Sequence, residues 1–301
     1  MAFHLRASES VPEGVRRIAI DQLRRAIGEI DDDSLSEDKT VHQIRKRCKK
    51  LRGLIRLVRP ALGKQYGTAN QLFRDAAREV SGLRDAQVLI NTYDKLMEHF
   101  TDQVNRPAFA TVRRELTMRL KALESQPAVS PLLELRERFE QAITLVDSWE
   151  LDDKGFSAIA AGVSKTHQRA RDCLQEVLVQ PNTDALHQLR KRIKYLSFQF
   201  RLLRQSWPAA SDALIETLKS IEDILGEDHD LAMLDQALAK EPNEFGDPQD
   251  VQAFRALIAT RRKQHQEKAI QQSRFVLAEE TSALTERFHA YWRIWRKKAA
   301  H

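Results

Sequence analysis

A cluster of basic residues occurs twice in this chain, and its residue types are those that bind phosphate groups. The sequence HQIRKRCKKL at 42–51 returns as HQLRKRIKYL at 187–196, at an offset of 145 residues. Arginine binds phosphate oxygens through two parallel hydrogen bonds, and lysine adds a point charge. Histidine donates one hydrogen bond when neutral and adds a charge when protonated. The duplicated cluster therefore indicates a site for an anionic ligand.

The duplication extends well beyond the basic residues. The same offset of 145 residues aligns Asp85 with Asp230. An unchanged offset over so long a stretch predicts one structural unit that is present in two copies. We expect a first repeat at 1–150 and a second at 151–301, which together form one domain.

Composition favours a folded, all-helical protein. Of the 301 residues, 42% are hydrophobic and 31% are charged, which is typical of a globular chain. The ten Gly and nine Pro lie mostly between segments of helical periodicity. We predict an all-α fold of two antiparallel helical-bundle repeats related by internal pseudo-two-fold symmetry. The predicted helices cover about 12–30, 38–59, 68–100 with a break near Ser81-Gly82, 106–125, 130–147, 156–179, 183–205, 210–240 and 248–298, the last as one rod or two.

Positive charge is concentrated in the two basic segments. Residues 41–59 contain eight Lys or Arg and no acid, and residues 186–204 contain six and no acid. Because the whole chain has a net charge of +6, the remainder carries a net charge of −8. A solvated helix face more often mixes both signs. The distribution is typical of a binding surface for a polyanion.

In a helix, the first basic segment places its cations on one face. At 100° per residue, six side chains fall within a stripe about 100° wide, beside an apolar face that includes Ile44, Leu51 and Leu54. Like charges at this spacing repel by roughly a few tenths of a kcal/mol per pair, a cost that a ligand with regular negative charges would offset. The first basic strip consists of His42, Arg45, Lys49, Arg52, Arg56 and Arg59.

The second basic segment repeats this arrangement with one cation fewer, because Ser197 stands where the first copy has Arg52. We therefore expect the first repeat to contribute more to binding. The two histidines are either direct phosphate ligands or half-buried residues that orient their neighbours. The second basic strip consists of His187, Arg190, Lys194, Arg201 and Arg204.

The pattern His-x-x-Arg-x-x-x-Lys, which starts at His42 and again at His187, resembles that of the CHAD domain family, the conserved histidine α-helical domain. The resemblance covers nearly the whole chain, including the duplication. A second motif, around Leu83-Arg84-Asp85 and Asp228-His229-Asp230, belongs to it. The resemblance implies two antiparallel helical-bundle repeats that bind inorganic polyphosphate in a basic central cavity formed by the two strips.

The same resemblance bears on catalysis. Some relatives carry a fused triphosphate-tunnel domain that supplies hydrolysis, but this sequence has no Glu-x-Glu-x-Lys signature and no strand-rich segment to hold one. The dipeptide His229-Asp230 is similar to one in metal phosphohydrolases, yet the first repeat has Arg84 there, so the histidine is outside the duplicated set. We expect a binding protein with no catalytic residues, no metal and no cofactor.

Other charged residues are candidates for minor roles. Asp85 and Asp230 are expected to orient or neutralise arginines of their own repeats. Lower-ranked candidates for phosphate contact lie on the first helix of each repeat, and they are Arg17, Arg24, Lys165 and Arg169.

The main alternative ligand is the phosphate backbone of a nucleic acid. Proteins that hold single strands usually add aromatic side chains, because stacking contributes about 1–3 kcal/mol per base. The first strip has no aromatic residue and the second has only Phe198 near its edge, which favours polyphosphate. An enzyme acting on phosphate chains is a third possibility, but no Gly-rich phosphate loop is present.

The expected location is the cytoplasm, with association to polyphosphate granules and no contact with membranes. No apolar segment has signal-peptide character, and none approaches the roughly 18 apolar residues that span a bilayer. Cys48 and Cys173 cannot form a disulfide framework, and we expect them to be small buried residues in a reducing compartment. The sequence identifies no protein partner.

Overall fold

The computed structural model describes residues 3–80, 82–125 and 131–298, and within these ranges it contains helices and no strand. The all-α expectation is therefore confirmed. The first helix, α1 (Val11–Ile30), begins at a capping box, in which Ser10 and Glu13 each accept a hydrogen bond from the other's backbone N–H. Pro12 lies in the first turn, where its missing N–H has no cost.

The remaining helices of the first half follow the breakers in the sequence. The basic helix α2 ends three residues before Pro60, and the predicted break near Ser81-Gly82 separates α3 from α4, although Ser81 itself lies outside the described residues. A short 3-10 turn, η1, precedes α5. The bounds are α2 (Glu37–Leu57), α3 (Gln65–Glu79), α4 (Gly82–His99), η1 (Arg106–Phe109), α5 (Ala110–Glu124) and α6 (Leu132–Asp147).

The second half has fewer and longer helices. The segment expected as one rod or two at 248–298 forms two helices, and a 3-10 turn, η2, follows the second basic helix. The bounds are α7 (Ser157–Val179), α8 (Thr183–Leu203), η2 (Arg204–Ser206), α9 (Pro208–Lys240), η3 (Pro242–Phe245), α10 (Pro248–Val276) and α11 (Thr281–Lys298).

Helix bounds in the two halves correspond at the sequence offset. Adding 145 to the bounds of α2 gives 182–202, and α8 spans Thr183–Leu203. The same offset relates α1 to α7, α5 to α10 and α6 to α11, while α3 and α4 together correspond to the single helix α9. This agreement concerns the elements alone, and the two-fold symmetry stays a prediction.

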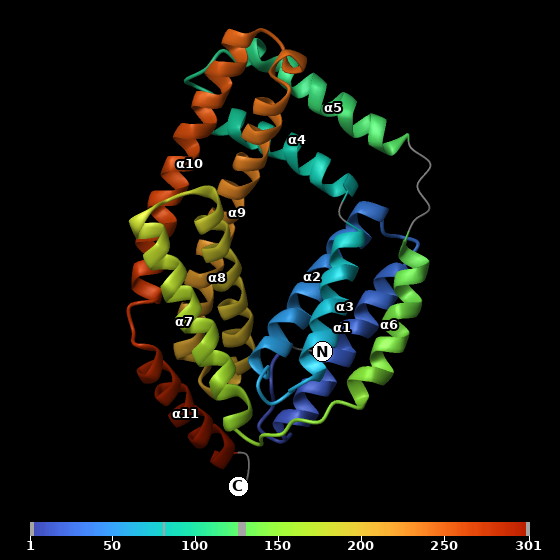
Figure 1. Cartoon of the computed structure of the whole chain (residues 1–301), viewed down its shortest axis with the longest axis vertical. Coiled ribbons are helices and arrows are strands. Elements are labelled where there is room, and N and C mark those ends of the chain that lie inside the picture. The colour runs from blue at the N-terminus through green and yellow to red at the C-terminus, as the bar shows by residue number, and fades with distance from the viewer. Residues whose placement is uncertain (1–2, 81, 126–130, 299–301) are drawn as a thin grey trace.

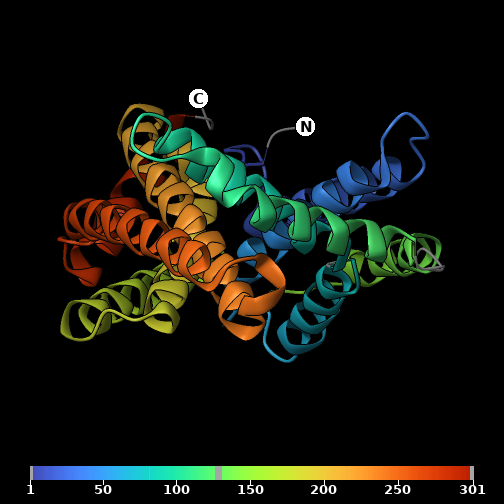
Figure 2. The ribbon, with the colours of Figure 1, turned by 90° about the horizontal axis from the view of Figure 1, so that it is seen from above.

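Two apolar clusters hold the helices together, and each uses both halves of the chain. The main core joins α1–α3 and α6–α8 with α11, the first part of α9 and the last part of α10. A distal cluster forms where α4 and α5 meet the last part of α9 and the first part of α10, around Tyr93, Phe109 and Phe254. The halves thus meet at the distal cluster, at the top of Figure 1, and again where α2 contacts α8. The view from above in Figure 2 shows the helices of the distal cluster crossing one another in front.

Two close backbone approaches fix the neighbours of α2. A Cβ atom on Gly53 would lie 2.8 Å from the Cβ of Phe198, so α8 touches α2 at this glycine. A Cβ atom on Gly162 of α7 would lie 1.8 Å from the carbonyl oxygen of Leu57, so α7 packs directly on the last turn of α2. Only glycine permits either approach.

We predict that Gly162→Ala destabilises the protein by at least about 3 kcal/mol, because the new methyl group would overlap a backbone oxygen that cannot move aside. Urea unfolding followed by circular dichroism measures this free energy. Gly28→Ala is the matched control: Gly28 is also in a helix, but nothing lies within 4 Å of its added Cβ. The control should be neutral or up to about 1 kcal/mol more stable. Equal stability of the two variants would contradict the close α2–α7 contact.

Candidate functional site

The basic strips lie on α2 and α8, which cross near their C-terminal ends. Besides the contact at Gly53, the guanidinium of Arg56 stacks on the ring of Tyr195, 4.1 Å from its centroid. The apolar faces of both helices are buried as predicted, with Leu51 and Leu196 fully covered. Burial of one face therefore holds the adjoining cations at the crossing.

On α2, polar neighbours position the cations. Arg45 Nη1 lies 3.4 Å from Oδ1 of Asp85, at the start of α4. Arg52 donates from Nε to Oδ1 of Asn70 at 3.3 Å, and Arg56 donates from Nη1 to the carbonyl oxygen of Arg52 at 2.9 Å. Asp85 thus contacts an arginine of its own repeat. The remaining strip members in α2 are His42, which is exposed, and Lys49, which is half-buried.

On α8, the cations pack against α9. Lys194 forms an ion pair with Glu222. Arg190 lies over Gly226, where an added Cβ would be 3.1 Å from Nη2, so the glycine leaves space for the guanidinium. The Nε of Arg190 is buried and has no hydrogen-bond partner among the described residues. This arginine is held in place without being neutralised.

A pair of histidines adjoins Arg190. The ring of His187 lies against that of His229 of α9, with centroids 4.7 Å apart and planes inclined at 39°. Nδ1 of each ring is buried without a hydrogen-bond partner in the described part of the chain. Burial lowers the pKa of both rings, and the charge of Arg190 lowers each further. Both rings are therefore neutral at neutral pH. A bound anion would shift them toward the protonated form.

Charges of the two helices influence one another. Burial lowers the pKa of Lys191 in α8, and positive charges that include Arg52 and Arg56 of α2 lower it further. From the start of α4, the charge of Asp85 acts in the opposite direction on the pKa of His229. The cations of α2 and α8 therefore belong to one electrostatic region. Lys191 is not a member of the second basic strip as predicted from the sequence.

The C-terminal members of both strips lie outside α2 and α8. The prediction that the helices extend to Arg59 and to residue 205 is therefore wrong. Arg59 follows the end of α2, and its guanidinium stacks on Tyr66 at 4.7 Å from the ring centroid. Arg204 lies in η2, where it is paired with Asp212, at 2.7 Å between Nη2 and Oδ2. The helical period does not apply beyond the last turn, so each helical strip ends one cation earlier than predicted.

Arg201 lies in α8 on the side of the crossing where α2 presents Lys50. The pKa of Lys50 is lowered to about 8, mainly by burial and further by the charges of Arg47, Lys46 and Arg201. Arg47 itself is paired with Glu29 of α1, at 2.5 Å between Nη2 and Oε1. On this side, a carboxylate therefore neutralises part of the positive charge.

The lower-ranked cations separate into different environments. Arg17 donates two hydrogen bonds to Glu9, of 2.7 and 2.6 Å, and one of 2.9 Å to the carbonyl oxygen of His4. It anchors the N-terminal segment, and we no longer count it among the phosphate contacts. Arg24 is exposed on α1, away from any described pocket.

Lys165 and Arg169 of α7 adjoin the end of the first strip in a small pocket, which we name the crossing pocket. No carboxylate lines it among the described residues. Its fifth cation, Arg192, was missed because its position in a helical projection, about 140° from His187, lies at the edge of the apolar face. The crossing pocket is lined by Arg56, Arg59, Pro60, Gly162, Lys165, Thr166, Arg169, Arg192 and Tyr195.

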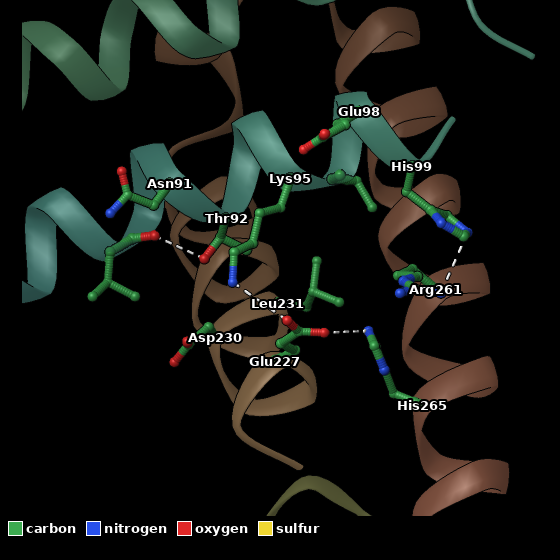
Figure 3. Close-up of a pocket in the computed structure, with 12 residues that line it drawn as sticks. Asn91, Thr92, Lys95, Glu98, His99, Glu227, Asp230, Leu231, Arg261 and His265 are labelled. Atoms are coloured by element: carbon green, nitrogen blue, oxygen red, sulfur yellow. Dashed lines mark hydrogen bonds and ion pairs between the residues drawn. The ribbon is translucent and has the colours of Figure 1, made fainter. Parts of the chain in front are cut away.

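A larger pocket, of about 580 Å³, lies beneath α4 against α9 and α10 (Figure 3). In it, Glu227 accepts a hydrogen bond of 3.3 Å from Lys95 and faces Nε2 of His265 at 3.4 Å. Asp230 also lines this pocket, whereas no residue of either basic strip is among its described lining residues. Because the lining combines both signs of charge, we do not assign the polyanion to it.

Asp228 is a buried carboxylate to which sequence analysis gave no role. It is 2% exposed and pairs with Arg262 of α10 at 3.0 Å. Arg262 also donates to Oγ1 of Thr183 at 3.0 Å, so the network joins α8, α9 and α10 beside the histidine pair. In the sequence, Asp228 stands at helical spacing from Leu225 and Leu231, which is the signal for its burial.

Two features are missing from the described part of the chain. It contains no group of three or more His, Cys, Asp or Glu side chains that could hold a metal ion. None of its helices combines the length and apolar character needed to cross a membrane. What the site offers chemically is a set of fixed, partly desolvated cations.

Fold and site together define an all-α protein in which two histidine-bearing basic helices cross. The family model of the CHAD domain matches residues 17–239, from within α1 to nearly the end of α9. The chain therefore belongs to the CHAD domain family. A search of curated proteins finds no match.

We predict that stability depends on pH through the histidine pair. Since burial lowers the pKa of His187 and His229 in the folded state, below about pH 6.5 the unfolded chain binds protons that the folded chain does not. The free energy of unfolding should fall as pH decreases from 7 toward 5. A His187→Asn/His229→Asn variant should show a shallower fall in urea unfolding, and its stability at pH 8 gives the packing cost alone. An unchanged slope would exclude the pair as the source.

Proposed function

We propose that this protein binds inorganic polyphosphate, without a chemical reaction, through the basic faces of α2 and α8 lining a common groove or channel. The observation that carries the proposal is the direct contact of the two basic helices, at Gly53 against Phe198 and at Arg56 on Tyr195. A linear chain of phosphates offers regular negative charge to such a surface. Membership of the CHAD domain family supports the same ligand. The proposed location is the cytoplasm, at polyphosphate granules.

The length of the helical strip suits a polymer. From His42 to Arg56, α2 presents cations over about 21 Å at 1.5 Å per residue. A ligand that contacts this whole distance must carry several negative groups in a row. The histidine pair beside Arg190 adds two groups that gain charge when an anion approaches. The surface therefore favours long phosphate chains over single small anions.

The two strips differ in how readily they release their carboxylate partners. The side chain of Asp85 is 65% exposed, so its pair with Arg45 is close to a surface ion pair of about 0–1 kcal/mol. Glu222 is 12% exposed and holds Lys194 more firmly. A phosphate group can replace Asp85 at lower cost than Glu222, which supports a larger contribution from the first repeat.

Single-stranded nucleic acid suits the site less well. Base stacking needs exposed aromatic faces beside the cations. Tyr195 and Phe198, the aromatic residues of α8 at the crossing, are 6% and 5% exposed. They support the cations from within the core and offer no free face to a base. Binding to duplex phosphates alone needs no stacking, and it is an outcome of the competition experiment below.

We predict that unlabelled long-chain polyphosphate displaces labelled polyphosphate at least tenfold better than single-stranded DNA, RNA, duplex DNA or heparin of equal charge. The measurement is competition binding at one fixed salt concentration, because affinity for a polyanion depends steeply on salt. The same incubation with Mg²⁺ should release no orthophosphate. If a nucleic acid competes as well as polyphosphate does, the phosphate backbone of nucleic acids becomes the preferred ligand and the proposal of polyphosphate fails.

A second prediction concerns the strip itself: Arg45→Glu/Lys49→Glu/Arg52→Glu should weaken polyphosphate binding by at least 100-fold. The substituted side chains lie on the basic side of α2, so helicity should be preserved. The control, Lys263→Glu/Lys268→Glu/Arg274→Glu, makes the same change in charge at three exposed positions of α10 and should lose less than threefold. Similar losses in both variants would mean that net charge, and not the strip, governs affinity.

A further inference from the structure

The crossing pocket gathers positive charge from three helices. Arg56 comes from α2, Lys165 and Arg169 from α7 and Arg192 from α8, with Arg59 in the turn after α2. Within the described residues, none of these five side chains forms an ion pair with a carboxylate. The cluster has no counter-charge of its own.

The lack of a carboxylate is unusual because Arg56 and Arg192, the innermost arginines of the pocket, are partly desolvated. Burial lowers the pKa of Arg56, and the charges of Arg52 and Arg192 lower it further, whereas Tyr195 and Tyr66 act in the opposite direction. Nη1 of Arg56 donates a hydrogen bond to the backbone carbonyl oxygen of Arg52, which carries no full negative charge. Nε of Arg192 is buried without a hydrogen-bond partner in the part of the chain described. Desolvated cations without a carboxylate partner are costly, and an anion in the pocket would offset that cost.

The corresponding place in the other half of the chain shows how such charge is neutralised when no ligand is needed. At the offset of 145 residues, Arg192 corresponds to Arg47, which is paired with Glu29. The residue that corresponds to Glu29 is Leu174, which carries no charge. The acid is therefore present on one side of the crossing and absent from the other.

For a second arginine too, the carboxylate partner is present on one side of the crossing and absent from the other. Arg59 corresponds to Arg204, which is paired with Asp212, and the residue that corresponds to Asp212 is Gly67. In addition, Lys165 corresponds to an apolar residue, Ile20. Conversely, Gly162 and Tyr195 correspond to Arg17 and Lys50, so the counterpart has six cations against five. Three of these six are paired with carboxylates, namely Arg17, Arg47 and Arg204. The crossing pocket differs in having no such pair among the described residues, so the two sides of the crossing are not equivalent.

The size of the crossing pocket restricts what can enter it. Its volume is about 20 Å³, close to the 10–15 Å³ or so that one water needs. Gly162 lines it, so it begins where the backbones of α2 and α7 touch. A polymer cannot pass through such a space. One oxygen of a tetrahedral anion can enter, with the rest of the group at the mouth among the longer cationic side chains.

We propose that the crossing pocket binds a single phosphate group, supplied either by the end of a phosphate chain or by free orthophosphate. A terminal phosphate carries close to two negative charges at neutral pH, as a phosphomonoester does, whereas an interior phosphate of a chain carries one. Five cations therefore favour the terminal group over the interior ones. The chain-end source rests on the proposed function, whereas binding of orthophosphate does not.

The test compares a pocket variant with a matched variant outside the pocket and outside both strips. Lys165→Gln/Arg169→Gln removes two charges from the pocket, and Lys39→Gln/Lys46→Gln removes two exposed charges of α2. Calorimetric titration with orthophosphate and with pyrophosphate should give one site per molecule in the unaltered protein. The pocket variant should weaken this site at least tenfold, and the matched variant less than twofold.

Polyphosphate then distinguishes the two sources. If the pocket holds a chain end, capping the terminal phosphates as phosphoramidates should lower the affinity of short chains as much as the pocket variant does. If the pocket holds free orthophosphate, orthophosphate and long chains should bind together without competition. Absence of any orthophosphate or pyrophosphate site, with polyphosphate affinity unchanged in the pocket variant, would overturn the inference and leave the proposed function intact. If orthophosphate binds to the pocket but polyphosphate does not bind to the protein, the proposed function is wrong and the orthophosphate site stands.

Discussion

Repulsion between the cations of α2 and α8 is the constraint for which the rest of the structure must compensate. Each like-charged pair on a helix costs roughly a few tenths of a kcal/mol, whereas a fully buried Leu or Ile side chain contributes about 1.5–3 kcal/mol. Both helices bury a complete apolar face, and Gly53 lets them touch directly. Core burial therefore outweighs the repulsion. The neighbours of the crossing then decide which cations are neutralised by carboxylates and which are left for a ligand.

The two halves meet this constraint differently. In the first half, α3 and α4 are two separate helices, and Asp85 at the start of α4 reaches Arg45. In the second half, α9 runs without interruption, and its side chains pack along α8, with Glu222 on Lys194 and His229 on His187. The more exposed carboxylate belongs to the first half. The two basic helices thus differ in the exposure of their carboxylate partners, while the paired cations Arg45 and Lys194 are equally exposed.

Much of this arrangement could be predicted from the sequence, because the helical period fixes which side chains share a face. The buried face of α2 and the burial of Cys48 follow from spacing alone, whereas spacing left open whether His42 is exposed or half-buried. The period fails where a helix stops, and for this reason Arg59 and Arg204 were placed wrongly.

The spacing of residues along the sequence does not predict which side chains of distant segments contact one another. The clamp of Arg17 on Glu9 depends on the path of the N-terminal segment, and the gathering of Lys165 with Arg192 depends on how α7 and α8 meet α2. Neither arrangement has a local signature. A single sequence identifies candidate cations, and the tertiary structure separates those that anchor the chain from those that face an open pocket.

The distal cluster has a mechanical consequence. The halves are joined there as well as at the α2–α8 crossing, so the molecule is a frame fixed at two separate points. Rotation of one half relative to the other would break one of these two contacts, so we expect a ligand to enter without domain closure. Neither half completes its apolar contacts alone, because α4 and α5 need α9 and α10. Despite its length, the chain should therefore denature as one cooperative unit, and not as two halves in succession.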